Sequence, residues 1–263
     1  MKEIHSLSTV GMVWLPNKQM GMLHNGKMEV YDHVYEACSW QDPYIYIGYR
    51  NGQERVVVNG VPQRWFQTIR RVSITADGRH YAYPAMAKGR WYGVVDGQVS
   101  QSYASITQWQ YTADRQHILY VGQSATYNNR IKRTQYVVFD TTRYGPYQMV
   151  RTIRLSPTGP HWAVVVKQHG KEHVLWNGKL GPAYPAIIPS SVCPNEDGTD
   201  CAYVACADHK MYFCTFKSGQ GPAYQHIRLC AYTHGHYAYE VVERDRSYFV
   251  IDGVPQPAYN EVS

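Results

Sequence analysis

The stretch Thr75-Ala-Asp-Gly78, Tyr81-Ala-Tyr83, Trp91-Tyr-Gly-Val-Val95, Asp96-Gly97 and Tyr103 decides the fold of this chain. Two turn sequences bracket two short apolar runs, and a third run follows them. Asp-Gly or Asn-Gly between apolar runs indicates a tight β-hairpin, because the mirror-image turn needs positive φ at its centre. The stretch therefore predicts consecutive antiparallel strands.

The same pattern recurs along the whole chain. Turns equivalent to Asp96-Gly97 follow one another at intervals of 34 to 44 residues, at Asn25-Gly26, Asn59-Gly60, Asp96-Gly97, Asp140-Thr141, Asn177-Gly178, Ser218-Gly219 and Asp252-Gly253. A period near 40 with four strand-length segments is typical of a propeller blade. We therefore expect an all-β fold, a seven-bladed β-propeller of four-stranded antiparallel blades, forming a single domain over residues 1–263.

The period also places the strands of individual blades. In the third repeat we expect strands at about 70–75, 80–86, 91–95 and 101–106. The first strand of the first repeat is expected near Ile4, and the last strand of the last repeat at 258–262. Aromatic residues recur after the turns, at Phe66, Tyr103, Tyr147, Tyr184, Tyr224 and Tyr259. Aromatic side chains at fixed offsets are most simply packing between neighbouring sheets.

Two of these repeats resemble a known family. Ser156-Pro-Thr-Gly159 with Ala163-Val164, and Thr75-Ala-Asp-Gly78 with Ala82-Tyr83, are similar to the Ser-Pro-Asp-Gly…Ala-Tyr/Phe signature of TolB-type, WD-repeat-like propellers. The Trp-Asp and Gly-His pairs of ordinary WD repeats are absent from the sequence. The resemblance implies the propeller fold and a tendency to bind partners, and it supplies no catalytic residues.

Composition narrows the class of protein. The chain has 24 tyrosines and 7 tryptophans but only 17% charged residues, which favours sheet over helix. No apolar run is long enough to span a membrane, and the N-terminus lacks the apolar region of a signal peptide. The formal charge of +6 is compatible with several kinds of anionic partner.

The six cysteines, at 38, 193, 201, 206, 214 and 230, contain no Cys-x-x-Cys pair. Strand alternation sends Cys201 and Cys206 to opposite faces of a sheet, so we expect free thiols and no metal site. Free thiols favour a reducing compartment, which here means the cytoplasm. No motif calls for a cofactor, and the sequence holds no recognisable catalytic set.

Arginines recur where one blade connects to the next. Gln67-Thr-Ile-Arg70, Tyr147-Gln-Met-Val-Arg151 and Tyr224-Gln-His-Ile-Arg228 share a pattern, and the candidate residues there are Arg70, Arg71, Arg151, Arg154, His226 and Arg228. In a propeller these links lie at the same end as the connections between the second and third strands. Converging guanidinium groups bind carboxylate or phosphate, although such arginines also serve as structural ion pairs. Both interpretations stay open.

The fourth repeat carries an insertion between Gly122 and Tyr136. Its candidate binding residues are Tyr127, Arg130, Lys132 and Arg133, a mixture of basic and aromatic side chains that suits an acidic peptide or a nucleotide. The alternative is a solvated hairpin extension, because insertions in surface loops cost little.

Two functions follow from these observations. The first is a non-catalytic binding module that engages a protein or peptide on the end carrying the links. The second is a site for a small anionic ligand such as a nucleotide, with or without turnover. Extended nucleic acid is a less favoured partner, because it would need a continuous basic stripe. The absence of a catalytic set favours the binding module.

Overall fold

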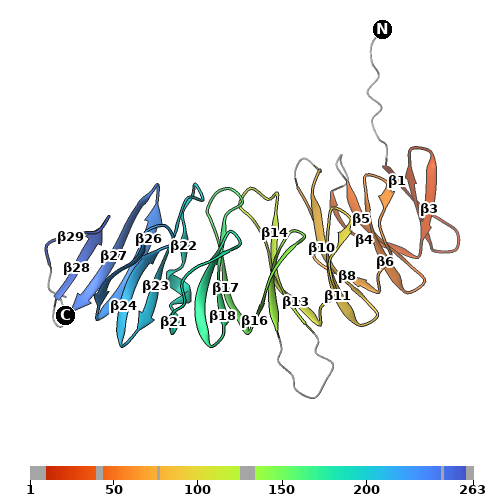
Figure 1. Cartoon of the computed structure of the whole chain (residues 1–263). Coiled ribbons are helices and arrows are strands. Elements are labelled where there is room, and N and C mark those ends of the chain that lie inside the picture. The colour runs from red at the N-terminus through yellow and green to blue at the C-terminus, as the bar shows by residue number, and fades with distance from the viewer. Residues whose placement is uncertain (1–9, 40–43, 76–77, 125–133, 244–245, 259–263) are drawn as a thin grey trace, which may run out of the picture. The chain divides into compact units, whose positions relative to one another are not determined.

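Seven antiparallel sheets follow one another along the chain in the computed structural model, which describes residues 10–39, 44–75, 78–124, 134–243 and 246–258. The structure divides into two compact units, residues 1–106 and 107–263. Each sheet is built from strands that are consecutive in the chain (Figure 1). The expected repeat of antiparallel sheets is confirmed, and each unit is described by itself below.

The first unit contains the first three sheets. Sheet 1 consists of β1 (Val10–Trp14), β2 (Met20–His24) and β3 (Lys27–Tyr31). Sheet 2 consists of β4 (His33–Ser39), β5 (Ile45–Arg50), β6 (Gln53–Val58) and β7 (Val61–Pro62). Sheet 3 has a divided first strand, β8 (Thr68–Ile69) and β9 (Ser73–Ile74), followed by β10 (Tyr81–Ala87), β11 (Arg90–Val95) and β12 (Gln98–Val99).

The second unit contains sheets 4 to 7. Sheet 4 consists of β13 (Ser105–Tyr111), β14 (Ile118–Gln123), β15 (Gln135–Phe139) and β16 (Thr142–Tyr147). Sheet 5 consists of β17 (Met149–Leu155), β18 (Trp162–Gln168), β19 (Lys171–Trp176) and β20 (Lys179–Leu180).

Sheet 6 again has a divided first strand. It contains β21 (Ala186–Ile187), the 3-10 turn η1 (Pro189–Ser191), β22 (Cys193–Pro194), β23 (Cys201–Ala207), β24 (Lys210–Thr215) and β25 (Gly219–Tyr224). Sheet 7 consists of β26 (His226–Thr233), β27 (His236–Glu243), β28 (Arg246–Ile251) and β29 (Val254–Pro255). No helix in the part of the chain that the structure describes is long and apolar enough to cross a membrane.

The predicted hairpins have the backbone that their sequences require. Asp96 and Gly97 have φ of 48° and 79°, so both central residues of this turn lie in the left-handed region. Asp tolerates that region better than most residues and Gly occupies it without cost. The turn lies between β11 and β12, where Val95 pairs with Gln98. In sheets 2 to 7 the repeated turn joins the third and fourth strands, and in sheet 1 the turn Asn25-Gly26 joins β2 and β3, the last two strands described there.

The expected strand boundaries were wrong at the fourth strand of the repeat. In sheet 3 this strand is β12 (Gln98–Val99), with one further bridge between Trp91 and Tyr103, and not 101–106. Pairing starts directly at the two-residue turn, and β13 of the next sheet already begins at Ser105. In sheet 7 the fourth strand is β29 (Val254–Pro255). The strand expected near Ile4 and residues 259–262 of the last strand lie outside the described residues.

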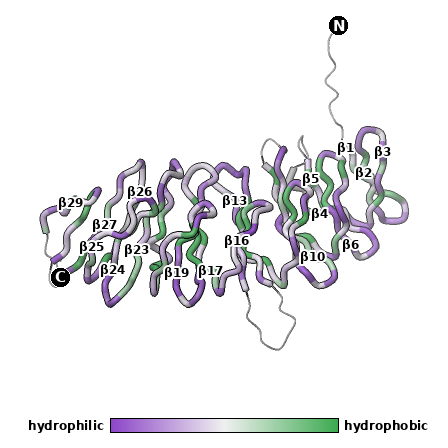
Figure 2. The backbone as a smooth tube through the Cα atoms, viewed as in Figure 1, coloured by the Kyte–Doolittle hydropathy of each residue, from purple (hydrophilic) through white to green (hydrophobic). Residues whose placement is uncertain are grey.

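The core of each unit lies between consecutive sheets. One buried cluster joins sheets 2 and 3 and includes Phe66 and Tyr83, and another joins sheets 4 and 5 and includes Tyr147. The remaining clusters join sheets 1 and 2, 5 and 6, and 6 and 7. Figure 2 shows hydrophobic residues along the strands and hydrophilic residues at the turns. The expected packing role is confirmed for the described aromatic residues that follow the turns, since each is at most 8% exposed: Phe66, Tyr103, Tyr147, Tyr184 and Tyr224.

Candidate binding edge

Each sheet has two ends with different contents. We call one the link edge: it carries the connection from the second to the third strand and the link that enters the sheet. Gln67, in the link before β8, accepts a hydrogen bond from Gly89 N at 3.3 Å with its Oε1 atom. Gln148 does the same for Gly170 N at 2.8 Å, and Asp32 Oδ2 accepts from Asn51 N at 3.0 Å. One polar side chain in each of these links therefore fastens the neighbouring connection.

We call the other end the hairpin edge, because it carries the hairpin between the third and fourth strands. The Asn or Asp of this hairpin accepts, with Oδ1, a hydrogen bond from a backbone N–H at the beginning of the second strand. The distances are 2.8–2.9 Å in five sheets, from Tyr44 N to Asn59, Tyr81 N to Asp96, Ile118 N to Asp140, Trp162 N to Asn177 and Tyr237 N to Asp252. The hairpin edge thus satisfies its own polar groups.

Histidines complete the hairpin edge. Nδ1 of His80, His117 and His236 lies 2.7–2.9 Å from the second carboxylate oxygen of the hairpin Asp, at Asp96, Asp140 and Asp252. The hydrogen bond from His236 holds the pKa of Asp252 below its ordinary value. The sequence analysis did not single out these histidines. The available signal was their fixed position directly before the residue whose backbone N–H bonds the hairpin Asn or Asp, at His80, His117, His161 and His236.

Consecutive sheets are joined by an acceptor that the sequence analysis also missed. Glu172, 5% exposed, is the second residue of β19 and accepts a hydrogen bond from Ile187 N of the next sheet at 2.7 Å. Glu54 receives the equivalent bond from Ile69 N at 2.6 Å, and Gln135 from Val150 N at 2.5 Å. Each acceptor lies five residues before its hairpin Asn or Asp, and that spacing was the available signal.

The structure places the predicted arginines near the start of their sheets, several within strands and not in loops. Arg151 lies in β17, and its Nη1 atom donates to Glu172 Oε1 at 2.8 Å. Arg70 follows β8 with its guanidinium 5.0 Å from the ring centroid of Trp91. Arg71, Arg154 and Arg228 are exposed. Tyr127, Arg130, Lys132 and Arg133 lie outside the described residues.

Basic residues recur at the link edge beyond those predicted. Lysine or arginine lies in the described part of the connection between the second and third strands, or at the strand ends that flank it, in sheets 2, 3, 5, 6 and 7: Arg50, Lys88 and Arg90, Lys167 and Lys171, Lys210, and Arg246. In sheet 1, Lys18 lies in the connection between β1 and β2. Among the described residues the hairpin edge carries the carboxylates Asp96, Asp114, Asp140, Glu196, Asp197, Asp200 and Asp252, but also the basic residues Lys27, Arg79, Arg115, Arg143, Lys179 and Lys217. The link edge carries carboxylates too, at Asp32, Glu54, Glu172, Asp208 and Glu243. The two edges therefore differ in their balance of charge, with an excess of basic residues at the link edge.

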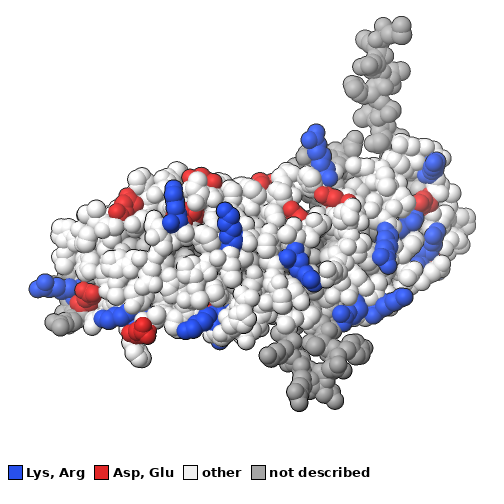
Figure 3. Space-filling model, viewed as in Figure 1, with Lys and Arg blue, Asp and Glu red and all other residues white. Residues whose placement is uncertain are grey.

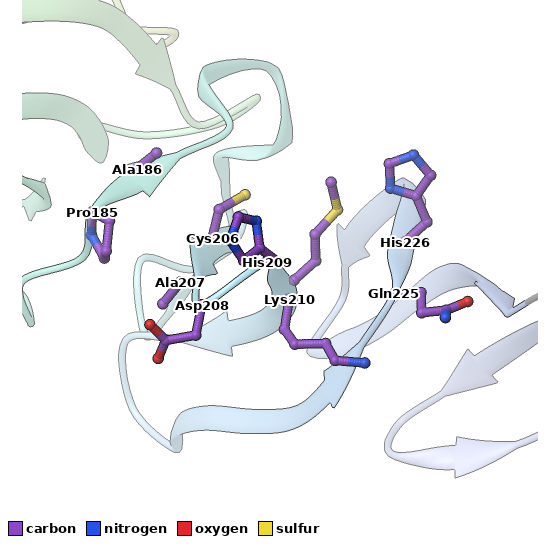
Figure 4. A pocket seen from close by; sticks show the side chains of 10 residues that line it. Pro185, Ala186, Cys206, Ala207, Asp208, His209, Lys210, Gln225 and His226 are labelled. Carbon is purple, nitrogen blue, oxygen red and sulfur yellow. The ribbon is translucent and has the colours of Figure 1, made fainter.

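A cavity of about 450 Å³ opens at the link edge of sheets 6 and 7. Three segments line it: Pro185-Ala186 at the start of sheet 6, Cys206 to Met211 around the β23–β24 connection, and Gln225-His226 before and at the start of β26 (Figure 4). The predicted residue His226 is thus part of a cavity. Burial, with a smaller contribution from the Glu172 carboxylate, raises the pKa of the Cys206 thiol.

A second cavity, of about 390 Å³, lies at the other end of the sheets, in the first unit. Its lining includes His24 and Lys27 at the hairpin edge of sheet 1, and Gly60 and Pro62 of sheet 2. Arg55 lies beside this region, 2.5 Å from Glu29 and 4.5 Å from the ring centroid of Trp65. None of the residues predicted from the sequence lines this cavity.

The pKa shifts of the described tyrosines result mainly from burial in the packed sheets. Cys193, Cys201, Cys206 and Cys214 are free thiols, as the sequence predicted for them. Burial raises the pKa of Tyr81 and of Tyr184 to about 12, so both phenols stay protonated at neutral pH. Among the residues that the structure describes, no group of three or more His, Cys, Asp or Glu side chains is arranged to hold a metal ion.

Comparisons with known proteins return propellers at low similarity. No family model matches the sequence, and no curated protein matches it. TolB from Acinetobacter baumannii aligns at 13% identity over 80% of this chain, with a TM-score of 0.35. The Dos1 propeller aligns at 8% identity over 98% of this chain and 86% of that one, with a TM-score of 0.37.

An acylaminoacyl peptidase from Pyrococcus horikoshii aligns at 10% identity over 85% of this chain, with a TM-score of 0.34. The chain spans 60% of the TolB chain and 45% of the peptidase chain. At these identities and TM-scores the likeness carries no argument about function.

Proposed function

We propose that this chain is a non-catalytic binding module that engages a protein or peptide partner on the link edge of its sheets. The excess of basic residues at the link edge carries this proposal. A surface of one sign attracts a partner of the opposite sign and raises the rate of encounter. The hairpin edge binds its own carboxylates to backbone amides and histidines, whereas the connections at the link edge present exposed lysines such as Lys88, Lys171 and Lys210.

The proposal includes a closed fold. We propose that the seven sheets form one propeller ring and act as a single domain over residues 1–263. The sequence supports this, because seven hairpin turns recur at intervals of 34 to 44 residues, a period typical of propeller blades. A compact domain of this length has a radius of gyration of about 18 Å. Small-angle X-ray scattering tests the ring, and a value near 25 Å or above would contradict it.

A small anionic ligand held by the arginines is the alternative. Arg151 argues against it, because its guanidinium already contacts the largely buried carboxylate of Glu172. An incoming phosphate would have to compete with that carboxylate. Figure 3 shows uncharged and acidic residues between many of the lysine and arginine side chains on the face in view, whereas extended nucleic acid requires a continuous basic stripe. These observations favour a protein or peptide.

A displayed random peptide library selected on the full chain tests the proposal. We expect enriched peptides whose binding is lost when the link-edge charges are reversed in the variant Lys88→Glu, Lys171→Glu, Lys210→Glu. The matched control reverses two exposed lysines of the hairpin edge, Lys27→Glu and Lys179→Glu, and should bind normally. Failure to enrich any peptide, or equal losses in the two variants, would overturn the proposal.

A further inference from the structure

We infer that the cavity at the link edge of sheets 6 and 7 takes an acidic side chain of the peptide partner; this inference rests on the function proposed above. The cavity volume of about 450 Å³ exceeds that of a single side chain, so a glutamate with part of its backbone fits. Its lining comes from the start of β21, the β23–β24 connection and the link before β26, all within one compact unit. A folded unit therefore positions the cavity without outside help.

The polar lining of the cavity is rich in hydrogen-bond donors. Lys210 and His209 come from the β23–β24 connection, and Gln225 and His226 come from the link that enters sheet 7. In Figure 4 the carboxylate of Asp208 points away from His226. Ammonium, imidazole and amide N–H groups on two sides of a cavity suit a carboxylate, and hydrogen bonds to an ionised acceptor are about twice as strong as neutral ones.

The remaining lining selects a peptide over a nucleotide. Pro185, Ala186, Ala207 and Met211 supply a small apolar wall. Single-stranded nucleic acids are bound by stacking bases on aromatic rings, and no Phe, Tyr or Trp is among the described lining residues of this cavity. A carboxylate on an aliphatic stem matches the combination of donors and apolar wall, because the stem contacts the wall while the charge meets the donors.

The β23–β24 connection, which forms half of the cavity, is held in place by strand pairing. Cys206 pairs with Ala186 across β23 and β21, and Ala207 pairs with Lys210 across the β23–β24 turn. On the opposite side, Ile227 N donates to Met211 Sδ at 3.3 Å, which holds the link against the hairpin. The backbone that carries the donors is therefore ordered before binding, so binding has to immobilise their side chains but not the chain itself.

Fluorescence anisotropy with two labelled peptides tests the inference on the full chain. The first peptide alternates glutamate and alanine, and the second replaces each glutamate with glutamine. We expect the glutamate peptide to bind at least tenfold more tightly. Lys210→Glu should weaken its binding at least tenfold, Lys210→Arg should retain it, and Asp208→Asn should strengthen it about twofold to threefold, because the carboxylate of the lining is removed.

Lys179→Glu is the matched control, because Lys179 is also exposed but lies at the hairpin edge of sheet 5; its affinity should stay within twofold of the parent. Circular dichroism melts confirm that each variant is folded. Equal affinity for the two peptides, or equal effects of Lys210→Glu and Lys179→Glu, would overturn the inference. Tighter binding of an oligothymidylate that also depends on Lys210 would overturn it in favour of nucleic acid.

The outcomes separate this inference from the proposed function. If the library selection enriches neutral peptides whose binding still needs the link-edge lysines, the inference of an acidic side chain in the cavity is wrong, whereas the proposed binding of peptides at the link edge is supported. If no peptide binds the link edge at all, both fail.

Discussion

The two edges of the sheets contain similar backbone turns but use their side chains differently. At the hairpin edge, Asn177 Oδ1 accepts a hydrogen bond from Trp162 N, and in other sheets a histidine contacts the second carboxylate oxygen of the hairpin Asp. At the link edge, Gln148 fastens a connection whose lysines, Lys167 and Lys171, remain available to solvent or a partner. The difference teaches that polar side chains can stabilise a sheet by pairing within it, while a connection held by one such side chain still presents others to solvent.

The largest effect should come from the acceptor that joins sheets 5 and 6. Glu172→Ala removes the partner of Ile187 N and of Arg151. A buried donor left unsatisfied, together with a broken ion pair at a largely buried carboxylate, should cost about 3 kcal/mol of unfolding free energy. Urea titration measures the loss. Glu172→Gln keeps an acceptor and should cost about 1 kcal/mol; if both variants unfold like the parent, Glu172 does not join the sheets.

A pair of variants compares the two edges directly. Asn177→Ala removes the acceptor of Trp162 N and forces alanine to a φ of 44°, which should cost about 2 kcal/mol. Gln148→Ala removes an exposed acceptor from Gly170 N and should cost about 0.5 kcal/mol. Thermal and urea unfolding of the two proteins measure both values. A larger loss for Gln148→Ala would reverse the comparison.

The smallest effect concerns pH. The folded protein holds the pKa of Asp252 below its ordinary value, so the ionised carboxylate stabilises the fold above the unfolded pKa of about 3.9. That contribution is lost as the pH falls through the lower, folded pKa. Asp252→Asn keeps the acceptor for Tyr237 N but removes the charge facing His236. The parent should therefore be the more stable protein at pH 5 to 6.

Urea midpoints measured from pH 6 down to pH 2.5 check this prediction. The difference between the parent and Asp252→Asn should shrink below pH 4 and disappear at the lowest pH at which both fold. A difference that grows as the pH falls would show that the carboxylate does not stabilise the fold.

The sequence predicted the parts of this structure that depend on local contacts. The Asp96-Gly97 turn and its equivalents specify hairpins through their own backbone conformation, so the seven sheets could be counted in advance. The role of Glu172 could not, because its partners Ile187 and Arg151 lie in other strands and one of them in another sheet. The strand limits failed for a similar reason: pairing begins at the turn, and the packing of the next sheet decides where it ends.

The candidate site was predicted only in part. The repeated Gln-x-x-Arg pattern predicted a site at the link edge, and His226 lines the cavity found there. The sequence analysis did not predict that the glutamines of the links bond the neighbouring connections. It also did not identify the recurrence of lysine in the connections of the link edge. These glutamines and lysines share a position relative to a strand end, which becomes visible only once the strand limits are known.

Hydrogen–deuterium exchange of the full chain, with and without the glutamate–alanine peptide, tests the central claim most directly. The account predicts slower exchange at Ala207–Lys210 and Gln225–Arg228 when the peptide is bound, with no change at the hairpin residues 177–180 and 252–254. Protection confined to those hairpin residues, with the link edge unchanged, would contradict it.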